Sequence, residues 1–418
     1  MDHEPVDQEK KEHHFFLIIL ILGALSTLSP LSIDMYLPAF PQMADAFHTT
    51  AAAISLSISS YFVGLSLGQI FYGPVLDRFG RKRPTYFGLT LFIIASMGCL
   101  KSPSVEWLIA FRFLQALGGS VAQVSSTAMV RDFFHAREAA KIFSILMLIL
   151  GVSPLFAPTI GSLITLALGW QAVFVTLAGI VFLTLMATYF FLPEGHEPDP
   201  SISLKLKPIF KEFFAILKEP QFSTYTLAGG FSFGGLFVYV AGSPIIFMNV
   251  FHVSVRLYGI LFAILSIGVI GGGQFNILLA RKFRIESIFL TALMIQVATS
   301  LLFVIGALMG WWSLHETLVL LFICLSCLGL TYPNAAALAL APFSKNAGSA
   351  SALLGFLQMG IGALASASVG LFGSNNILPI AGSLLGSSLI GACILFFGRS
   401  KIKVDIEVQK DGSTLVIH

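Results

Sequence analysis

The sequence alternates between long apolar runs and short polar segments from residue 15 almost to its end. A membrane-spanning helix needs about 20 consecutive apolar residues, and twelve such runs can be separated along the chain. We expect helices over 15–44, 51–76, 84–100, 105–130, 140–166, 170–192, 222–250, 255–280, 285–310, 315–341, 348–373 and 377–398. The pattern therefore predicts an all-α integral membrane protein with twelve transmembrane helices.

Composition supports this class. Hydrophobic residues make up 56% of the 418 residues and charged residues only 11%, against roughly 25% charged residues in a soluble domain. The net charge of +3 says little about partners, and we expect no nucleic-acid partner. Four cysteines, Cys99, Cys324, Cys327 and Cys393, lie within apolar runs. This placement indicates packing rather than disulfides or metal binding.

The twelve runs fall into two sets of six, separated by a polar, proline-rich stretch. Within that stretch, apolar residues at helical spacing over 208–218 predict a short helix on the membrane surface. Two six-helix halves are a common transporter plan, with the substrate site between the halves. We divide the chain into a charged N-terminal tail that we expect to be disordered (1–14), a first half (15–192), a linker (193–221), a second half (222–398) and a basic tail (399–418).

The positions of Lys and Arg predict the orientation. If both ends lie in the cytoplasm, only Lys101 and Arg256 of the 24 Lys and Arg residues fall in outer segments, and Arg112 falls inside a helix. The other 21 lie in cytoplasmic segments. Because cytoplasmic loops are enriched in Lys and Arg, this bias predicts cytoplasmic N- and C-termini.

Two charges are predicted to lie well inside the membrane. Asp34 follows nineteen uncharged residues and is flanked by Pro30 and Pro38, and a carboxylate there costs roughly 2.5–3.5 kcal/mol on insertion scales. Arg112 lies roughly 9 Å and Asp34 roughly 15 Å from the outer ends of their helices, at 1.5 Å per residue. These depths allow direct or water-mediated contact. A proton-coupling site is the favoured interpretation, and a purely structural ion pair is the alternative.

Helical spacing suggests which residues accompany these charges in a central cavity. Thr27, Pro30 and Leu37 share the face of Asp34, and Gln115 lies one turn after Arg112. Aromatic candidates are Tyr61, Phe231, Phe233 and Tyr239. The pattern leaves open whether these aromatic side chains face the cavity or a neighbouring helix.

The basic turn after the second predicted helix carries a recognisable motif. Residues 73–84 read Gly-Pro-Val-Leu-Asp-Arg-Phe-Gly-Arg-Lys-Arg-Pro. Gly73 permits close approach, Gly80 permits a tight turn, and Asp77 can accept hydrogen bonds at a helix N-terminus. The segment resembles the signature loop of the major facilitator superfamily. The resemblance implies that Gly73, Asp77, Arg78, Gly80, Arg81 and Lys82 form a conformational latch between the halves.

Two helical motifs extend the resemblance. Arg112-Phe-Leu-Gln115 resembles the fourth-helix motif of proton-coupled members, with Ala116 in place of its first glycine. Residues 151–162 resemble the fifth-helix motif of exporters at Gly151, Pro154, Pro158 and Gly161, while Ala157 and Ser162 replace two of its glycines. Physically, this is a helix with a small-residue face that can pack closely and bend. Ordinary close packing is the alternative. We expect the small-residue pairs Gly64/Gly68 and Gly382/Gly386 to be close-packing faces as well.

Several further segments narrow the family. Residues 29–38, 60–64, 68–74, 131–132 and 228–235 resemble the Bcr/CflA drug-resistance branch. This resemblance implies a multi-pass exporter in the bacterial inner membrane that exchanges protons for small amphiphilic antibiotics such as bicyclomycin, phenicols or sulfonamides. It implies alternating access driven by the proton gradient, without a cofactor or metal. We expect a monomer whose partners are drug, protons and membrane lipids.

Other classes fit the sequence less well. A proton-linked transporter of a physiological solute, such as an amino acid derivative, a sugar or a siderophore, is the alternative within transport. A receptor or scaffold is disfavoured because the chain carries no substantial soluble domain. An enzyme is disfavoured because no HExxH motif, nucleophile elbow or clustered His/Asp set is present.

Overall fold

The computed structural model describes residues 4–202, 204, 206–343, 346–372, 376–402, 406–408 and 414–416. The first set of helices comprises α1 (Glu4–Asp34), η1 (Leu37–Ala39), α2 (Phe40–Ala46), α3 (Ala51–Phe79), α4 (Lys82–Leu100), α5 (Val105–Phe133), α6 (Ala136–Leu168) and α7 (Trp170–Phe191). After α8 (Leu206–Leu217), the second set comprises α9 (Pro220–Pro244), η2 (Ile245–Val250), α10 (Val255–Ala280), α11 (Ile285–Met309), α12 (Leu314–Leu340), α13 (Ala347–Phe372) and α14 (Leu378–Arg399). Strands β1 (Ile406–Val408) and β2 (Thr414–Val416) form a short antiparallel pair.

Eleven of the described helical segments are long and apolar enough to cross a membrane. Helix α5, the fourth expected span, is not among them, because it is rich in polar residues that it buries against its neighbours. Arg112, Gln115, Ser125 and Ser126 on α5 are all fully buried. The apolar surfaces of α1, α3 and α4 therefore surround a helix whose own sequence is less hydrophobic.

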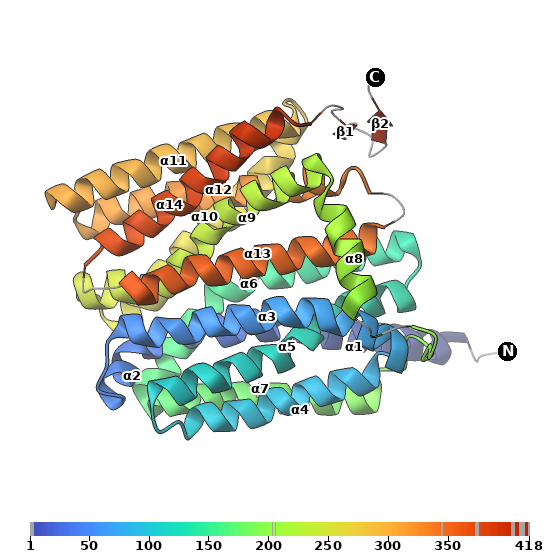
Figure 1. Ribbon diagram of the computed structural model, residues 1–418. Coiled ribbons are helices and arrows are strands. Elements are labelled where there is room, and N and C mark those ends of the chain that lie inside the picture. Colours follow the sequence, from blue (N-terminus) through green and yellow to red (C-terminus); the bar gives the residue numbers. More distant parts are fainter. Residues whose placement is uncertain are drawn as a thin grey trace.

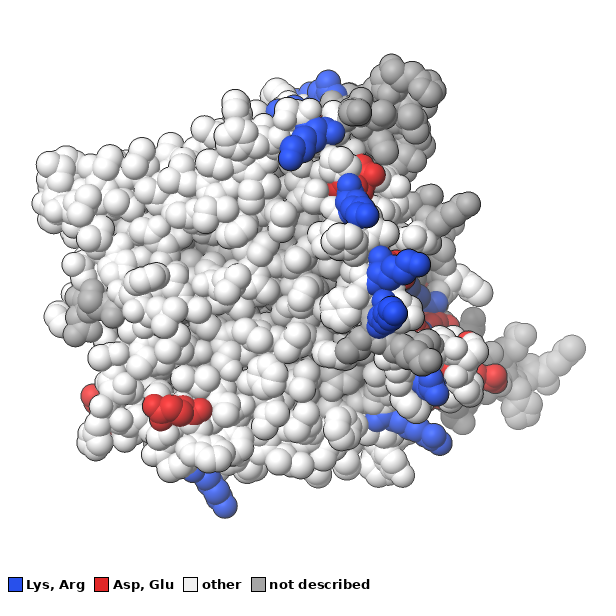
Figure 2. Space-filling model, in the orientation of Figure 1, with Lys and Arg blue, Asp and Glu red and all other residues white. Residues whose placement is uncertain are grey.

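The helices form two bundles that lie side by side (Figure 1). Helices α3 and α6 of the first bundle pack against α13 and α10 of the second. Helix α1 begins and α14 ends at the same end of the molecule, which we call the terminal face; the opposite end is the distal face. Lys and Arg side chains gather at the terminal face, and the middle of the visible surface carries no charged residue (Figure 2).

The bundles are packed together near the distal face and separated near the terminal face. One hydrophobic cluster combines residues of both bundles, and within it the Phe62 and Phe237 rings meet edge to face with centroids 4.3 Å apart. A cavity of about 560 Å³ lies between α3, α5, α8 and α13, with Asp77 and Arg131 among its lining residues. The molecule is thus closed distally and hollowed at the terminal face.

The contact between α3 and α13 is a small-residue seam with polar links. The Ser59 and Ser366 hydroxyl oxygens lie 2.7 Å apart, and the Ser66 hydroxyl donates to the Phe356 carbonyl oxygen at 2.9 Å. On the other side, the Ser162 hydroxyl of α6 donates to the Val255 carbonyl oxygen of α10 at 2.9 Å. Hydroxyl groups therefore connect the two bundles on both sides.

The two bundles share a turn that the sequence analysis did not identify as a repeat. His48 follows α2 with φ 51°, and His252 follows η2 with φ 52°. Each comes after a phenylalanine and two residues before a helix cap: the Thr50 hydroxyl accepts from the Ala53 amide, and the Ser254 hydroxyl from the Leu257 amide. This repeated turn joins corresponding helices of the two halves.

The expectations for the N-terminal tail and for one glycine pair were wrong. Helix α1 begins at Glu4, so much of the tail expected to be disordered continues the first helix. The Gly64/Gly68 pair does pack closely on α5, but a Cβ atom added at Gly382 or Gly386 would meet no atom within 4 Å. The second glycine pair is therefore not a packing face.

Candidate functional site

Arg112 is fully buried inside the first bundle. Its guanidinium donates to the Ser32 hydroxyl at 2.9 Å, to the Ser32 carbonyl oxygen at 3.2 Å and to the Gln115 side-chain oxygen at 2.5 Å. The guanidinium carbon also lies 4.6 Å from the centre of the Tyr36 ring and 4.1 Å from that of Tyr61. Neutral oxygens and the negative faces of two aromatic rings thus stabilise a cation that contacts no carboxylate among the described residues.

Asp34 points away from this arginine. Residues two positions apart in an α-helix are separated by about 200° around its axis. Asp34 and the arginine-bound Ser32 therefore lie on opposite sides of α1. Asp34 is 6% exposed, and no hydrogen bond or ion pair joins it to another described residue. It lies near Tyr239 and Tyr258 of the second bundle. Of the direct or water-mediated contact that similar depth allowed, no direct contact between Asp34 and Arg112 is found in the described structure.

The chain leaves α-helical geometry immediately after Asp34. Pro38 has no N–H to donate to the Asp34 carbonyl, and the chain continues as η1 and then α2. Gly161 of α6 packs against this break, since a Cβ atom at Gly161 would lie 2.1 Å from the Met35 carbonyl oxygen. The fifth-helix glycine thus allows α6 to approach the backbone beside Asp34.

The second bundle contains a polar network at the corresponding place. The Ser232 hydroxyl lies 2.7 Å from the Gln296 side-chain oxygen and 2.9 Å from the Thr331 hydroxyl, and the Gln296 amide donates to the Ser232 carbonyl at 3.1 Å. These residues come from α9, α11 and α12, the first, third and fourth spans of their half. In the first half, Ser32, Ser96, Arg112 and Gln115 come from α1, α4 and α5, which are also the first, third and fourth.

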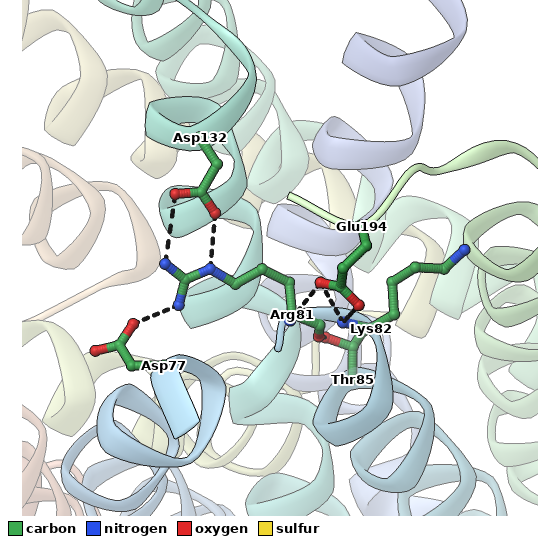
Figure 3. Close-up of polar contacts among 6 residues, drawn as sticks. All are labelled: Asp77, Arg81, Lys82, Thr85, Asp132 and Glu194. Atoms are coloured by element: carbon green, nitrogen blue, oxygen red, sulfur yellow. Dashed lines mark hydrogen bonds and ion pairs between the residues drawn. The ribbon is translucent and has the colours of Figure 1, made fainter. Parts of the chain in front are cut away.

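The signature loop forms a charged cluster at the terminal face (Figure 3). Arg81 donates to Asp77 at 2.5 Å and to Asp132, at the end of α5, at 2.7 Å. Burial of the Arg81 guanidinium acts to lower its pKa, but the hydrogen bonds and charges of Asp132 and Asp77 outweigh burial and raise that pKa above its usual value. The loop is thereby tied to α3 and α5 of its own half.

Glu194 of the linker completes this cluster, a role that the sequence alone did not indicate. Its carboxylate accepts from the Arg81 amide at 2.6 Å and from the Lys82 amide at 3.2 Å, at the start of α4 (Figure 3). A carboxylate at this end is favourable because the unpaired N–H groups of a helix N-terminus carry partial positive charge. The carboxylate follows directly on Pro193 at the end of α7, but its partners lie more than a hundred residues away in sequence.

The comparisons with known proteins identify the family. The profile described as Major Facilitator Superfamily matches residues 22–367. This chain belongs to the Major Facilitator Superfamily. As a member of a transporter superfamily, it is not an enzyme.

Curated relatives of this major facilitator protein cover nearly its whole length. The uncharacterized MFS-type transporter YdgK of Bacillus subtilis is 34% identical over 97% of this chain and 99% of its own. The bicyclomycin resistance protein homolog of Haemophilus influenzae is 29% identical over 91% of this chain and 94% of its own. The multidrug resistance protein MdtL of Escherichia coli O139:H28 is 30% identical over 90% and 93%.

Solved structures show the same fold at low sequence identity. The D-xylose-proton symporter matches with a TM-score of 0.71 and 15% identity, over 92% of this chain and 97% of its own. A bacterial homolog of the human lysosomal transporter Spinster, in an inward-facing and occupied conformation, matches with a TM-score of 0.70 and 16% identity, over 92% and 96%. The major facilitator fold, with its two bundles, is therefore established for this chain.

The structure separates the cavity candidates of this major facilitator protein into two groups. Tyr61 and Gln115 lie with Arg112 in the interior of the first bundle. Leu37 and Tyr239 are buried between the bundles with Asp34, and the Tyr239 hydroxyl has no hydrogen-bond partner among described residues. Of the remaining candidates, the Thr27 hydroxyl donates to a carbonyl oxygen of its own helix, and Pro30 and Phe231 are half-buried. The centre of the Phe233 ring lies 4.4 Å from that of the Tyr332 ring.

The structure explains part of the signature loop and part of the fifth-helix motif. Gly80 has φ +81°, as expected for the turn, and Arg78 donates to the Ile202 carbonyl oxygen of the linker at 2.6 Å. Gly73 is not a close-approach position, because a Cβ atom there would meet nothing within 4 Å. In the fifth-helix motif, Gly151 is similarly open, with one atom at 4.0 Å, while Pro154 and Pro158 lie inside α6.

Proposed function

We propose that this protein is a drug/proton antiporter that exports small amphiphilic antibiotics across the bacterial cytoplasmic membrane by alternating access. The names of the relatives from Haemophilus influenzae and Escherichia coli support drug as the cargo. The observation that carries the proposal is Asp34, a buried carboxylate between the two bundles with no ion-pair partner among described residues. An intramembrane carboxylate of this kind is suited to binding and releasing a proton.

The distribution of basic residues supports placing the terminal face in the cytoplasm. Lys and Arg gather on that face (Figure 2), as expected for cytoplasmic loops. In this orientation, the cavity between α3, α5, α8 and α13 opens inwards, and the packed distal face closes the path to the outside. The arrangement is that of a carrier ready to accept drug from the cytoplasm.

The proposed cycle depends on competition at Asp34. Drug enters from the cytoplasm and occupies the region that Asp34 shares with Tyr239 and Tyr258. After the halves rock, a proton from outside binds Asp34, displaces the drug and resets the carrier. Arg112 binds α1 through Ser32. This contact fixes the rotation of α1 about its axis, so that Asp34, on the opposite side of the helix, faces the second bundle.

The signature loop acts in this scheme as the latch at the cytoplasmic side. Asp77 lines the same cavity as Gly348 and Ser349 at the start of α13. In the present state, Asp77 is bound by Arg81. When the halves close at this face, the Asp77 carboxylate meets the positive end of α13, and this contact stabilises the outward-facing state.

Proton release on drug binding tests the proposal. Bicyclomycin or chloramphenicol is added to weakly buffered, detergent-solubilised protein, and pH is followed for wild type, Asp34→Asn and the control Asp45→Asn, which changes an exposed carboxylate of α2. We expect release from wild type and the control and none from Asp34→Asn, although that variant inserts and folds. Release that persists in Asp34→Asn would place the proton site elsewhere, and drug binding without any release would remove proton coupling from the proposal.

A further inference from the structure

A second hollow faces outward from the first bundle, away from the path between the halves. It has a volume of about 590 Å³ and lies between α3, α4 and α5. Three exposed aromatic rings border it: Phe71 is 45%, Phe79 43% and Phe87 69% exposed. The complete lining is Leu67, Phe71, Tyr72, Val75, Phe79, Arg83, Pro84, Phe87, Phe113 and Leu117. We call it the α3–α5 groove.

The length of the groove matches one lipid leaflet. Its lining on α3 extends from Phe79, at the terminal face, to Leu67, which is twelve residues or roughly 18 Å along the helix axis. Half of a hydrocarbon core of about 30 Å is about 15 Å. A groove of this length fits one acyl chain of the leaflet at the terminal face.

The charge in the groove lies where a lipid headgroup would be. Among the lining residues, Arg83 carries the only formal charge, and it lies at the terminal end of α4. An arginine presents a planar fork of N–H donors that binds phosphate in a bidentate manner. The apolar lining and the terminal guanidinium are thus arranged like the tail and headgroup of a phospholipid.

Arg83 is also the one basic residue of this loop that is free to bind an external anion. Arg78 donates to the Ile202 carbonyl, Arg81 is bound by Asp77 and Asp132, and the Lys82 ammonium donates to the Tyr189 carbonyl at 3.3 Å. Arg83 is exposed and makes no hydrogen bond, ion pair or ring contact with a described residue.

We propose that the α3–α5 groove is a binding site for one anionic phospholipid of the leaflet at the terminal face. One acyl chain lies along α3 between the aromatic rings, and the phosphate binds the Arg83 guanidinium. The site is separate from the proposed drug path, and the inference does not depend on what the protein transports.

Native mass spectrometry of delipidated protein, titrated with phosphatidylglycerol or phosphatidylethanolamine, tests the proposal through the dissociation constant of the first bound lipid. Arg83→Gln removes the cation, and Val75→Trp fills the groove with a larger side chain. If Val75→Trp does not fold, Leu67→Trp fills the groove at another lining position. Arg281→Gln is the matched control, because Arg281 is an exposed arginine that does not line the groove.

We expect wild type and Arg281→Gln to prefer phosphatidylglycerol, Arg83→Gln to bind it roughly fivefold more weakly, and the tryptophan variants to bind both lipids weakly. Equal losses in Arg83→Gln and Arg281→Gln would show diffuse surface charge and overturn the site. Unchanged binding in the tryptophan variants would show that no acyl chain occupies the groove. Equal affinity of wild type for both lipids would overturn the anionic headgroup.

Discussion

Arg112 and Asp34 show how two embedded charges of opposite sign can be stabilised separately. The arginine has three oxygen partners and two aromatic rings within its own bundle. The aspartate faces the other bundle, where it lies near two tyrosines. No described residue is a hydrogen-bond or ring partner of both charges, so neutralising one of them removes no direct contact of the other.

A double-mutant cycle measures this independence. Arg112→Lys should lower the free energy of unfolding by about 2 kcal/mol, because a lysine cannot replace all three guanidinium hydrogen bonds. Since the two residues share no partner, the double variant with Asp34→Asn should lose the sum of the two single effects to within about 0.5 kcal/mol. Chemical unfolding in mixed micelles gives the four values. A coupling free energy well above 1 kcal/mol would mean that the two charges interact directly.

The sequence predicted which charges are embedded but not what they contact. The uncharged runs around Asp34 and Arg112 place both residues inside helices. A direct or water-mediated contact was considered from similar depth alone, and depth does not say which side of a helix faces which neighbour. The side of α1 that meets Arg112 is the side that carries Ser32. The periodicity of a single sequence does not distinguish Ser32 from the other small polar residues of α1.

At the scale of elements, the break in α1 depends on a close approach by α6. Gly161 lies against the Met35 carbonyl, so a methyl group there must push α6 or the break aside. Overpacking of this kind typically costs about 1–3 kcal/mol. The displaced backbone is the segment that holds Asp34 against the second bundle.

Gly161→Ala should therefore lower both thermal stability and transport. Gly179→Ala on α7 is the control, because a Cβ atom there would meet nothing within 4 Å, and alanine favours a helix over glycine by about 1 kcal/mol. Unfolding midpoints in detergent and drug efflux from cells give the comparison. Wild-type behaviour of Gly161→Ala would show that the fifth-helix motif does not control the α1 break.

The helices themselves follow from the sequence because apolar run length determines where a span begins and ends. The expected span 255–280 coincides with α10. The short helix expected at 208–218 is found as α8 (Leu206–Leu217). What the sequence could not supply is the contact of Glu194 with the start of α4, since that hydrogen bond exists only after the linker folds back onto the signature loop.

At the scale of the whole molecule, alternating access requires the seam between α3 and α13 to separate near the distal face. Ser59 and Ser366 hold this seam with hydroxyl oxygens 2.7 Å apart. Ser59 lies eight residues into α3 from its distal end at Ala51, or roughly 12 Å along the axis. A covalent link at this position should therefore keep the distal face closed.

A disulfide between Ser59→Cys and Ser366→Cys, in a background without the four native cysteines, tests this requirement. Oxidation should abolish drug efflux in membrane vesicles, and a reductant should restore it, while each single-cysteine variant transports under both conditions. Efflux that continues in the fully cross-linked protein would show that this part of the seam stays closed throughout the cycle.

The turn repeated at His48 and His252 also bears on the history of the molecule. Its recurrence, together with polar networks on the first, third and fourth spans of each half, is what an ancestral duplication would leave. The two networks occupy corresponding spans but differ in chemistry: one contains a guanidinium, and the other consists of neutral amide and hydroxyl groups. The positive charge of these two networks thus lies in one half alone, while the matching network of the other half is buried and neutral.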